Sequence, residues 1–187
     1  MSRGNTRQRI QDVALELFAQ RGYEKTSLRE IAEHLDVTKA ALYYHFKSKE
    51  DIVVGLFQDL AEPCDEVVAW AEQQCPVSLD VKLEVLRRYS EALFAAAPLF
   101  RFMQENQATM RELSIGETFK NRVRTLVGIL QIPDAALTDQ VRCSAAVFTI
   151  HTGMFSLHET EGDPEDKRKA VLEVAQELVT TAHRNHG

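Results

Sequence analysis

The 187-residue sequence contains few of the residues that build strands and tight turns, with only 8 glycines and 5 prolines. This scarcity argues against an architecture of short strands and favours long helices. Cysteine is also scarce, since Cys64, Cys75 and Cys143 make an odd number without the paired spacing of a zinc site or a disulfide framework. We expect reduced, mostly buried thiols, with redox sensing as the alternative.

A long apolar segment is missing as well. The longest apolar stretch, Ala145 to Leu157, is interrupted by polar residues and is shorter than the roughly 18 residues that suggest a membrane span. The first six residues are not followed by the apolar stretch of a signal peptide. We therefore expect a cytoplasmic protein without a membrane partner.

Motifs that carry catalytic chemistry are absent from the sequence. There is no glycine-rich phosphate loop and no recognisable nucleophile motif, so we predict no catalytic residues and no cofactor. His151 and His158 lie seven residues apart and Glu159 follows them. Two histidines at this spacing are more typical of a polar pocket lining or of the surface than of metal ligands, so no metal site is predicted.

The formal net charge of -6 is unevenly distributed along the chain. Residues 1–50 contain nine Lys and Arg against seven Asp and Glu, which gives +2, and the remaining thirteen against twenty-one give -8. Neutralisation of phosphates is local, so a slightly basic amino-terminal part remains compatible with nucleic-acid binding.

Apolar residues recur at helical spacing through nearly the whole chain. Ile10, Val13, Ala14, Leu17 and Phe18, for example, form one stripe at i, i+3, i+4, i+7 and i+8. The pattern predicts an all-α fold of about nine helices. The clearest segments are 6–21, 27–35, 38–44, 48–73, 79–96, 119–130, 138–158 and 164–184, with a further helix whose first turn contains Pro98.

The first half of this pattern contains signals for two short helices and a tight turn. Ser27 and Glu30 form a Ser-x-x-Glu capping box before an apolar stripe, and Gly22 suits a left-handed end to the preceding helix. Thr38 can cap the next short helix. Two short helices joined in this way predict a helix-turn-helix.

The order of these motifs resembles the DNA-binding head of the TetR, or tetracycline repressor, family. The resemblance covers about the first 55 residues. It includes the S-x-R-E-I-A start of the second helix at Ser27–Ala32, the L-Y-x-H-F segment at Leu42–Phe46 and the K-x-K-E segment at Lys47–Glu50. It implies a three-helix amino-terminal head that binds operator DNA, followed by a helical body that binds a small molecule and dimerises.

The resemblance also indicates which side chains contact DNA. Lys39 and Tyr44 are the expected base contacts, Ala40 is placed to touch a thymine methyl and Arg29 is placed to reach a guanine. The expected phosphate contacts are Ser27, Thr38, Tyr43, His45 and Lys49.

Structural roles compete with these assignments for several of the residues. Leu42 and Phe46 are expected core residues. Tyr43 or Tyr44 can instead be partly buried and have only a structural role, and Lys47 can be a solvated surface charge.

The remainder of the chain is rich in aromatic residues from several predicted helices. A pocket lined by such residues suits a largely apolar small molecule, although each of them can equally be core. The candidate pocket residues are Trp70, Tyr89, Phe94, Phe102, Met103, Gln107, Phe119, Phe148, His151 and Phe155.

The last two predicted helices contain more apolar surface than one chain can cover, which predicts a homodimer. Small residues recur along one side of the 138–158 helix. The candidate interface consists of Ala145, Thr149, Thr152, Ser156, Val171, Val174 and Leu178.

These expectations combine into a DNA-binding transcriptional regulator, with a DNA-binding domain at 1–50 and a ligand-binding and dimerisation domain at 51–187. A repressor released from its operator by a small apolar effector is the leading interpretation. A ligand-independent DNA-binding dimer is the alternative, and a helical enzyme or carrier for a hydrophobic molecule is less favoured because no catalytic motif is present.

Overall fold

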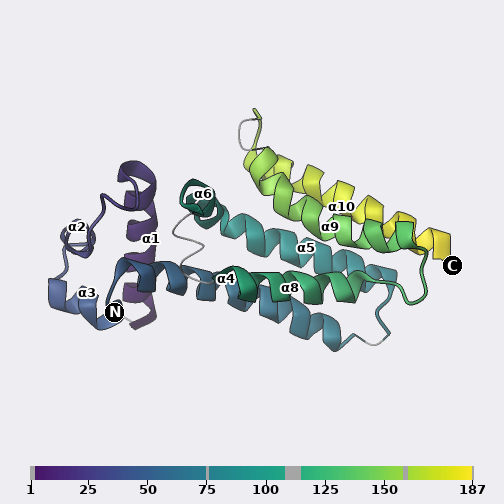
Figure 1. The fold of residues 1–187 in the computed structure, drawn as a ribbon, viewed down its shortest axis with the longest axis horizontal. Coiled ribbons are helices and arrows are strands. Elements are labelled where there is room, and N and C mark those ends of the chain that lie inside the picture. The colour runs from purple at the N-terminus through teal and green to yellow at the C-terminus, as the bar shows by residue number, and fades with distance from the viewer. Residues whose placement is uncertain (1–2, 75, 108–114, 158–159, 187) are drawn as a thin grey trace. The chain divides into compact units, whose positions relative to one another are not determined.

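The computed structural model describes residues 3–74, 76–107, 115–157 and 160–186. Within these ranges all regular structure is helical, which confirms the all-α prediction (Figure 1). The helices are α1 (Arg3–Arg21), α2 (Leu28–His34), α3 (Lys39–His45), α4 (Lys49–Glu72), α5 (Leu79–Ala95), α6 (Ala97–Glu105), α8 (Ile115–Leu130), α9 (Leu137–Ser156) and α10 (Pro164–His186).

The helices pack into two compact units. The first unit consists of residues 1–59 and 98–116, and the second of residues 60–97 and 117–187. Helix α4 contributes to both units, and α6 packs with the first unit although its neighbours in sequence belong to the second. This division describes packing, so the functional division at residue 50 remains a prediction.

The core of the first unit begins with α1, which buries the predicted stripe through Ile10, Ala14, Leu17 and Phe18. The helix ends at Gly22, whose φ of +89° lies in the left-handed region and whose amide donates to the Phe18 carbonyl at 2.9 Å. A glycine adopts this conformation without a steric penalty, so the predicted helix end is confirmed.

The second unit is centred on α5, α9 and α10. Helix α9 buries Ala146, Val147 and Ile150, and α10 buries Ala175 and Val179. At Gly153 an added Cβ would lie 2.4 Å from a Val171 methyl group, so glycine is required for this approach of α9 and α10. None of the helices in the described ranges is long and apolar enough to cross a membrane.

A buried lysine fastens the end of α8 to α5. Lys82 is 4% exposed, and its Nζ donates to the carbonyls of Leu130 and Gln131 at 2.9 and 3.0 Å. Carbonyls at the end of a helix lack hydrogen-bond donors within the helix, and here the Lys82 ammonium group is the donor. Burial lowers the pKa of Lys82, so these bonds offset a desolvation cost.

Replacement of Lys82 by methionine keeps the apolar stem and removes the donor. We expect a loss of about 2 kcal/mol in the free energy of unfolding, because two carbonyls would be left without a partner. Urea denaturation measures this loss. Lys169→Met is the matched control, since its amine is exposed and paired only with Asp166 at 3.7 Å. Equal stability of the two variants would contradict the assigned role of Lys82.

Candidate nucleic-acid interface and ligand site

Helix α2 starts with the predicted capping box. The Ser27 hydroxyl accepts from the Glu30 amide at 3.2 Å, and the Glu30 carboxylate accepts from the Ser27 amide at 2.7 Å and from its hydroxyl at 2.8 Å. These bonds hold the pKa of Glu30 below its usual range. The hydroxyl proton expected to reach a phosphate is therefore already donated within the chain.

Ser27→Ala removes this cap. We expect a loss of about 1 kcal/mol in the free energy of unfolding, the usual cost of losing a hydroxyl cap. Chemical denaturation measures it, and Ser27→Thr, which keeps the hydroxyl, should lose less than half as much. A stable alanine variant would show that the box contributes little.

Helix α3 is a seven-residue helix anchored by its apolar side. The hydroxyl of Thr38 caps it by accepting from the Ala41 amide at 3.2 Å. Leu42 is fully buried and Phe46 is 2% exposed, which confirms both as core residues. The opposite side of the helix is thereby turned toward solvent.

The exposed side of α3 displays the residues expected to contact DNA bases. Lys39, Ala40 and Tyr44 are exposed, and Tyr44 at 68% is among the most exposed large apolar side chains described. Tyr43 and His45 are half-buried: Lys39 lies over the Tyr43 ring at 5.3 Å, and His45 packs edge-on against Tyr44. The structure thus brings these five residues onto one short helix.

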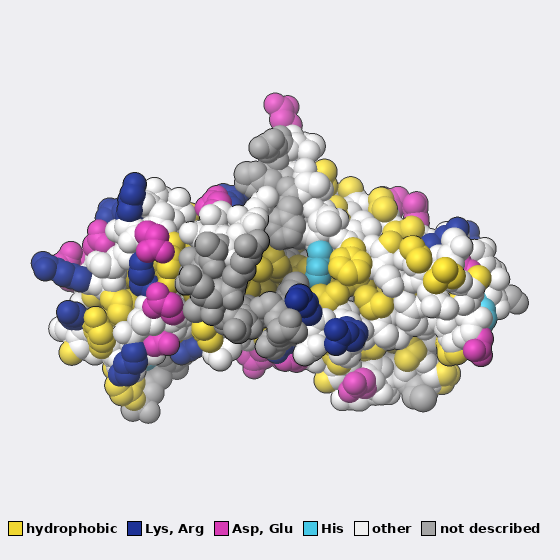
Figure 2. Space-filling view, in the orientation of Figure 1, with side chains coloured by type: hydrophobic (Ala, Val, Ile, Leu, Met, Phe, Trp, Pro, Cys, Tyr) yellow, Lys and Arg dark blue, Asp and Glu magenta, His cyan; other side chains and the backbone are white. Residues whose placement is uncertain are grey.

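Several basic side chains of this region are held by partners in the same chain. Lys49 donates to the Tyr23 carbonyl at 2.7 Å and lies 4.3 Å over the Tyr23 ring. Arg29 pairs with Glu33 at 2.7 Å, and Lys47 donates to the Tyr43 carbonyl at 2.6 Å. Over α2 and α3 the visible face presents Lys and Arg interspersed with Asp and Glu (Figure 2). Arg29 and Lys49 therefore each use one donor within the chain, and contact with DNA would use their remaining N–H groups.

The predicted ligand residues are spread over both units. Phe102 is 1% exposed and packs in the first unit against Phe18 and Tyr23, with ring centroids 5.4 and 5.7 Å away. Met103 is half-buried and Gln107 is exposed in that unit. The side chains of Phe119 and Phe155 lie outside the described part of the chain.

In the second unit the structure brings together Tyr89, His151 and Phe148. Tyr89 is 2% exposed, and its hydroxyl is hydrogen-bonded to Nε2 of His151. The Phe148 ring lies edge-on to the His151 ring, with the ring centroids 6.3 Å apart. Burial lowers the pKa of His151 to about 4. The imidazole is therefore neutral at pH 7. Phe94, half-buried on α5, is not among these ring contacts.

This arrangement predicts a loss of stability in mild acid. The unfolded chain takes up a proton at His151 near pH 6.5, whereas the folded chain resists protonation until about pH 4. The contribution of neutral His151 to the free energy of unfolding is fully present above pH 6.5. It is lost as the pH falls toward 4, by at most about 3 kcal/mol. Urea unfolding at pH 7.5 and 5.0 measures it. His151→Asn should shrink the difference between the two pH values; an unchanged difference would assign it to other groups.

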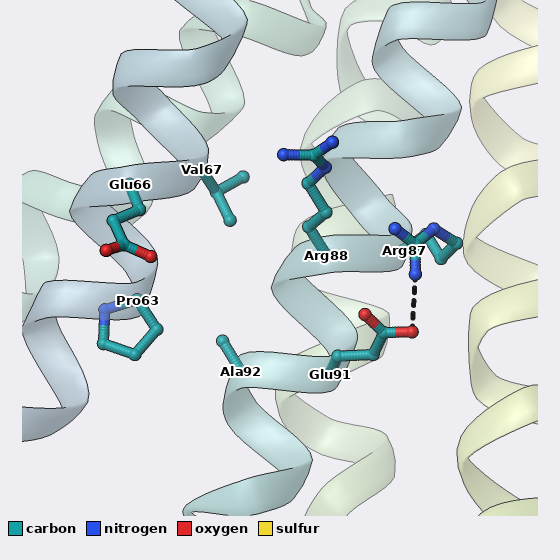
Figure 3. A pocket seen from close by; sticks show the side chains of 7 residues that line it. All are labelled: Pro63, Glu66, Val67, Arg87, Arg88, Glu91 and Ala92. Atoms are coloured by element: carbon teal, nitrogen blue, oxygen red, sulfur yellow. Dashed lines mark hydrogen bonds and ion pairs between the residues drawn. The ribbon is translucent and has the colours of Figure 1, made fainter.

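The pocket described in the second unit differs from the predicted aromatic one. It has a volume of about 350 Å³ and lies between α4 and α5 (Figure 3). Its lining consists of Pro63, Glu66, Val67, Arg87, Arg88, Glu91 and Ala92. Trp70, a predicted pocket residue, lies beneath the Arg88 guanidinium at 4.0 Å. The lining is mainly charged, so a pocket for an apolar molecule remains a prediction.

Apolar side chains are exposed on α9 and α10. Leu137 is 76% exposed, Val141 57%, Phe148 52% and Val174 49%. Among the predicted interface residues, Thr152 and Ser156 are exposed, and Ala145, Thr149, Val171 and Leu178 are half-buried. Leu137 and Val141 were not predicted, although their spacing of four residues, continued at Phe148, places them on one helical face.

The described part of the chain thus defines an all-helical protein with an amino-terminal helix-turn-helix. A family model described as "Bacterial regulatory proteins, tetR family" matches residues 10–56. The amino-terminal part of the chain is therefore similar to that of the tetR family of bacterial regulatory proteins. This confirms the resemblance seen in the capping box and the α3 motif.

Known proteins resemble different parts of the chain. The transcriptional regulator AcrR of Shigella flexneri is 57% identical over 53 residues, which cover 28% of this chain and 25% of AcrR. The negative transcriptional regulator IcaR of Staphylococcus aureus is 31% identical over 78 residues, 42% of each chain. A solved transcriptional regulator from Aquifex aeolicus has a TM-score of 0.70 at 19% identity and covers 90% of this chain and 96% of its own. The sequence matches span less than half of the curated relatives, whereas the fold likeness extends over nearly the whole chain.

Proposed function

We propose that the protein is a transcriptional repressor that binds operator DNA as a homodimer and is released by a small molecule. The observation that carries the proposal is the α2–turn–α3 unit. Its apolar side is anchored by Leu42 and Phe46, while Lys39 and Tyr44 face solvent. A helix anchored and exposed in this way suits insertion into the major groove of a duplex.

The proposed division of labour follows the predicted domains. Residues 1–50 bind DNA, and residues 51–187 bind the effector and dimerise. The negative regulator IcaR, which shares 31% identity over 78 residues, supports repression as the outcome. The exposed apolar side chains on α9 and α10 support a second copy of the chain as the partner.

Dimerisation sets a geometric condition on DNA binding. Two α3 helices occupy successive major grooves when they are about one helical turn of DNA, roughly 34–36 Å, apart. An effector that prefers a conformation with another separation weakens DNA binding by its difference in affinity for the two conformations. DNA weakens effector binding by the same factor.

The direct test is binding to the DNA upstream of the protein's own gene. The purified protein should bind this duplex at moderate salt at least about 1,000-fold more tightly than a shuffled duplex of equal length and composition. Gel-filtration with light scattering on the same sample should give twice the chain mass. A monomer without preference for any genomic fragment would overturn the proposal.

A DNA-binding dimer without an effector is the second candidate. It is favoured by the charged lining of the described pocket, which includes Glu66, Arg87, Arg88 and Glu91 and does not suit an apolar ligand. A screen that measures melting temperature and DNA release together separates the two candidates. A compound that raises the melting temperature and also releases DNA establishes the effector-controlled form.

A further inference from the structure

Arg7, in the second turn of α1, is half-buried and has no acidic partner among the described residues. Its guanidinium lies over the Phe46 ring at 4.7 Å, and no ion pair or hydrogen bond joins it to the described part of the chain. Every other half-buried arginine of the described ranges pairs with an acid. These pairs are Arg87 and Arg88 with Glu84, Arg122 with Asp65, Arg142 with Asp139 and Arg168 with Glu165.

The space for the Arg7 guanidinium is left by a glycine on α4. An added Cβ at Gly55 would lie 2.7 Å from Nη2 of Arg7 and 3.1 Å from the Phe46 ring. The guanidinium is therefore held against both the aromatic ring and α4. A guanidinium stacked in this way keeps a fixed plane, and its five N–H groups point outward from the edge of that plane.

The acidic residue one turn after Gly55 on α4 is already bonded to another side chain. Gln11, one turn after Arg7 on α1, is fully buried and donates from Nε2 to Oδ2 of Asp59 at 2.5 Å. Asp59 forms no ion pair with Arg7, so the chain leaves this cation without a counter-charge. A partly buried charge without a partner is unfavourable, and the arrangement suits an anion from outside the chain.

The ring beneath Arg7 belongs to the residue that directly follows the exposed helix α3. Phe46 is the last cap of α3, and the amino-terminal end of α1 lies beside it (Figure 1). A duplex that receives α3 in its groove places its sugar–phosphate backbone along the ends of that helix. We propose that Arg7 binds a backbone phosphate of DNA, with Phe46 and Gly55 fixing the plane of its guanidinium. This contact rests on the proposed function and adds α1 to the surfaces that hold the duplex.

The salt dependence of DNA binding tests the contact in the full-length protein. Arg7→Met keeps the apolar stem and removes the charge. The slope of log affinity against log salt concentration, between about 50 and 200 mM, should become shallower by about one per protomer. Affinity at about 100 mM salt should fall about tenfold, both for the DNA upstream of the protein's own gene and for a shuffled duplex, because phosphates are the same in every sequence. Fluorescence anisotropy with labelled duplexes measures both quantities.

Arg9→Met is the matched control for the loss of charge. Arg9 is exposed on the same helix, about 200° around its axis from Arg7, and has the same formal charge. This variant should keep the salt slope within about 0.5 of the wild type, because a charge that touches no phosphate releases no counterion. Arg7→Lys keeps a cation without the planar fork, so it should recover most of the slope but only part of the affinity.

Gly55→Ala tests the presentation of the guanidinium without changing any charge. The new Cβ would occupy the space of the Arg7 Nη2 atom, so the flexible end of the side chain must leave the Phe46 ring. We expect DNA affinity to fall about three- to tenfold. The same substitution should add less than about twofold in the Arg7→Met background, because the two residues act on one contact. Circular dichroism checks that the variants keep equal helicity.

The outcomes separate failure of the contact from failure of the proposed function. Equal salt slopes for Arg7→Met and the wild type, at normal wild-type affinity, overturn the phosphate contact and leave the proposed function standing. A lower melting temperature of Arg7→Met with an unchanged slope assigns Arg7 to packing on Phe46 alone. A wild-type protein that binds neither duplex overturns the proposed function and the Arg7 contact together.

Discussion

Tyr44→Ala should weaken binding to the operator about 10- to 100-fold and leave the melting temperature within 1–2 °C of the wild type, since a good side-chain contact to a base edge contributes about 1–3 kcal/mol. Tyr44 is 68% exposed, so the folded chain buries little of its ring. Its contact with His45 is an edge contact at the surface. The loss should therefore appear in DNA binding and hardly in stability.

Fluorescence anisotropy with a labelled operator duplex measures the affinity, and thermal denaturation measures stability on the same samples. Tyr44→Phe separates the ring from the hydroxyl: a base contact through the hydroxyl predicts that it behaves like alanine, and stacking predicts that it behaves like the wild type. Lys25→Ala removes an exposed side chain outside α3 and serves as a control. If Tyr44→Ala bound the operator with full affinity, the proposed base contact of Tyr44 would be contradicted.

Lys49 illustrates why such a test should avoid residues with structural roles. Its amine donates to the Tyr23 carbonyl and lies over the Tyr23 ring. A weaker affinity of Lys49→Ala would mix lost packing with a lost phosphate contact. The sequence motif identifies Lys49 as a candidate phosphate contact, whereas only the fold shows that its amine is bonded to and packed against Tyr23.

Local signals made most of the first unit predictable. A capping box, a left-handed glycine and a stripe of apolar residues each depend on residues close in sequence, so Ser27, Gly22 and Ile10 could be assigned without a structure. Structural features that depend on distant partners were not predictable in this way. Phe102 was assigned to a ligand pocket because it lies among body residues in sequence, yet it packs against Phe18 and Tyr23 of the first unit.

The face of α9 shows a second limit of sequence patterns. The helix is apolar on most sides, so its periodicity does not say which side packs within the chain. The small residues predicted an interface face through Ala145, Thr149 and Thr152, whereas the large apolar side chains of α9 that are more than half exposed are Leu137, Val141 and Phe148. At 100° per residue these three lie within about 40° of one another. The two faces are adjacent but rotated relative to one another, because α5 and α10 cover the remaining sides.

The exposed face therefore provides the sharper test of the dimer. Leu137→Glu combined with Val141→Glu places two carboxylates on it, and their counterparts in a symmetric partner would meet them, because a two-fold interface uses the same patch twice. We expect the dimer to dissociate at least about 100-fold more readily, since burying unpaired charges costs several kcal/mol. Operator affinity should fall by at least the same factor, because a single head keeps only half of the contacts.

Sedimentation velocity over a range of protein concentrations measures the dissociation, and anisotropy with the operator measures the affinity. The control is Gln73→Glu combined with Thr125→Glu, which adds the same charge at exposed positions on other parts of the second unit. Circular dichroism should show equal helicity in both double variants, because none of the four residues is buried. If the α9 variant stayed dimeric at nanomolar concentration, the partner would have to dock elsewhere. If the variant became monomeric but kept full operator affinity, DNA recognition would not require two heads. Control of DNA binding through the separation of the two α3 helices would then be contradicted.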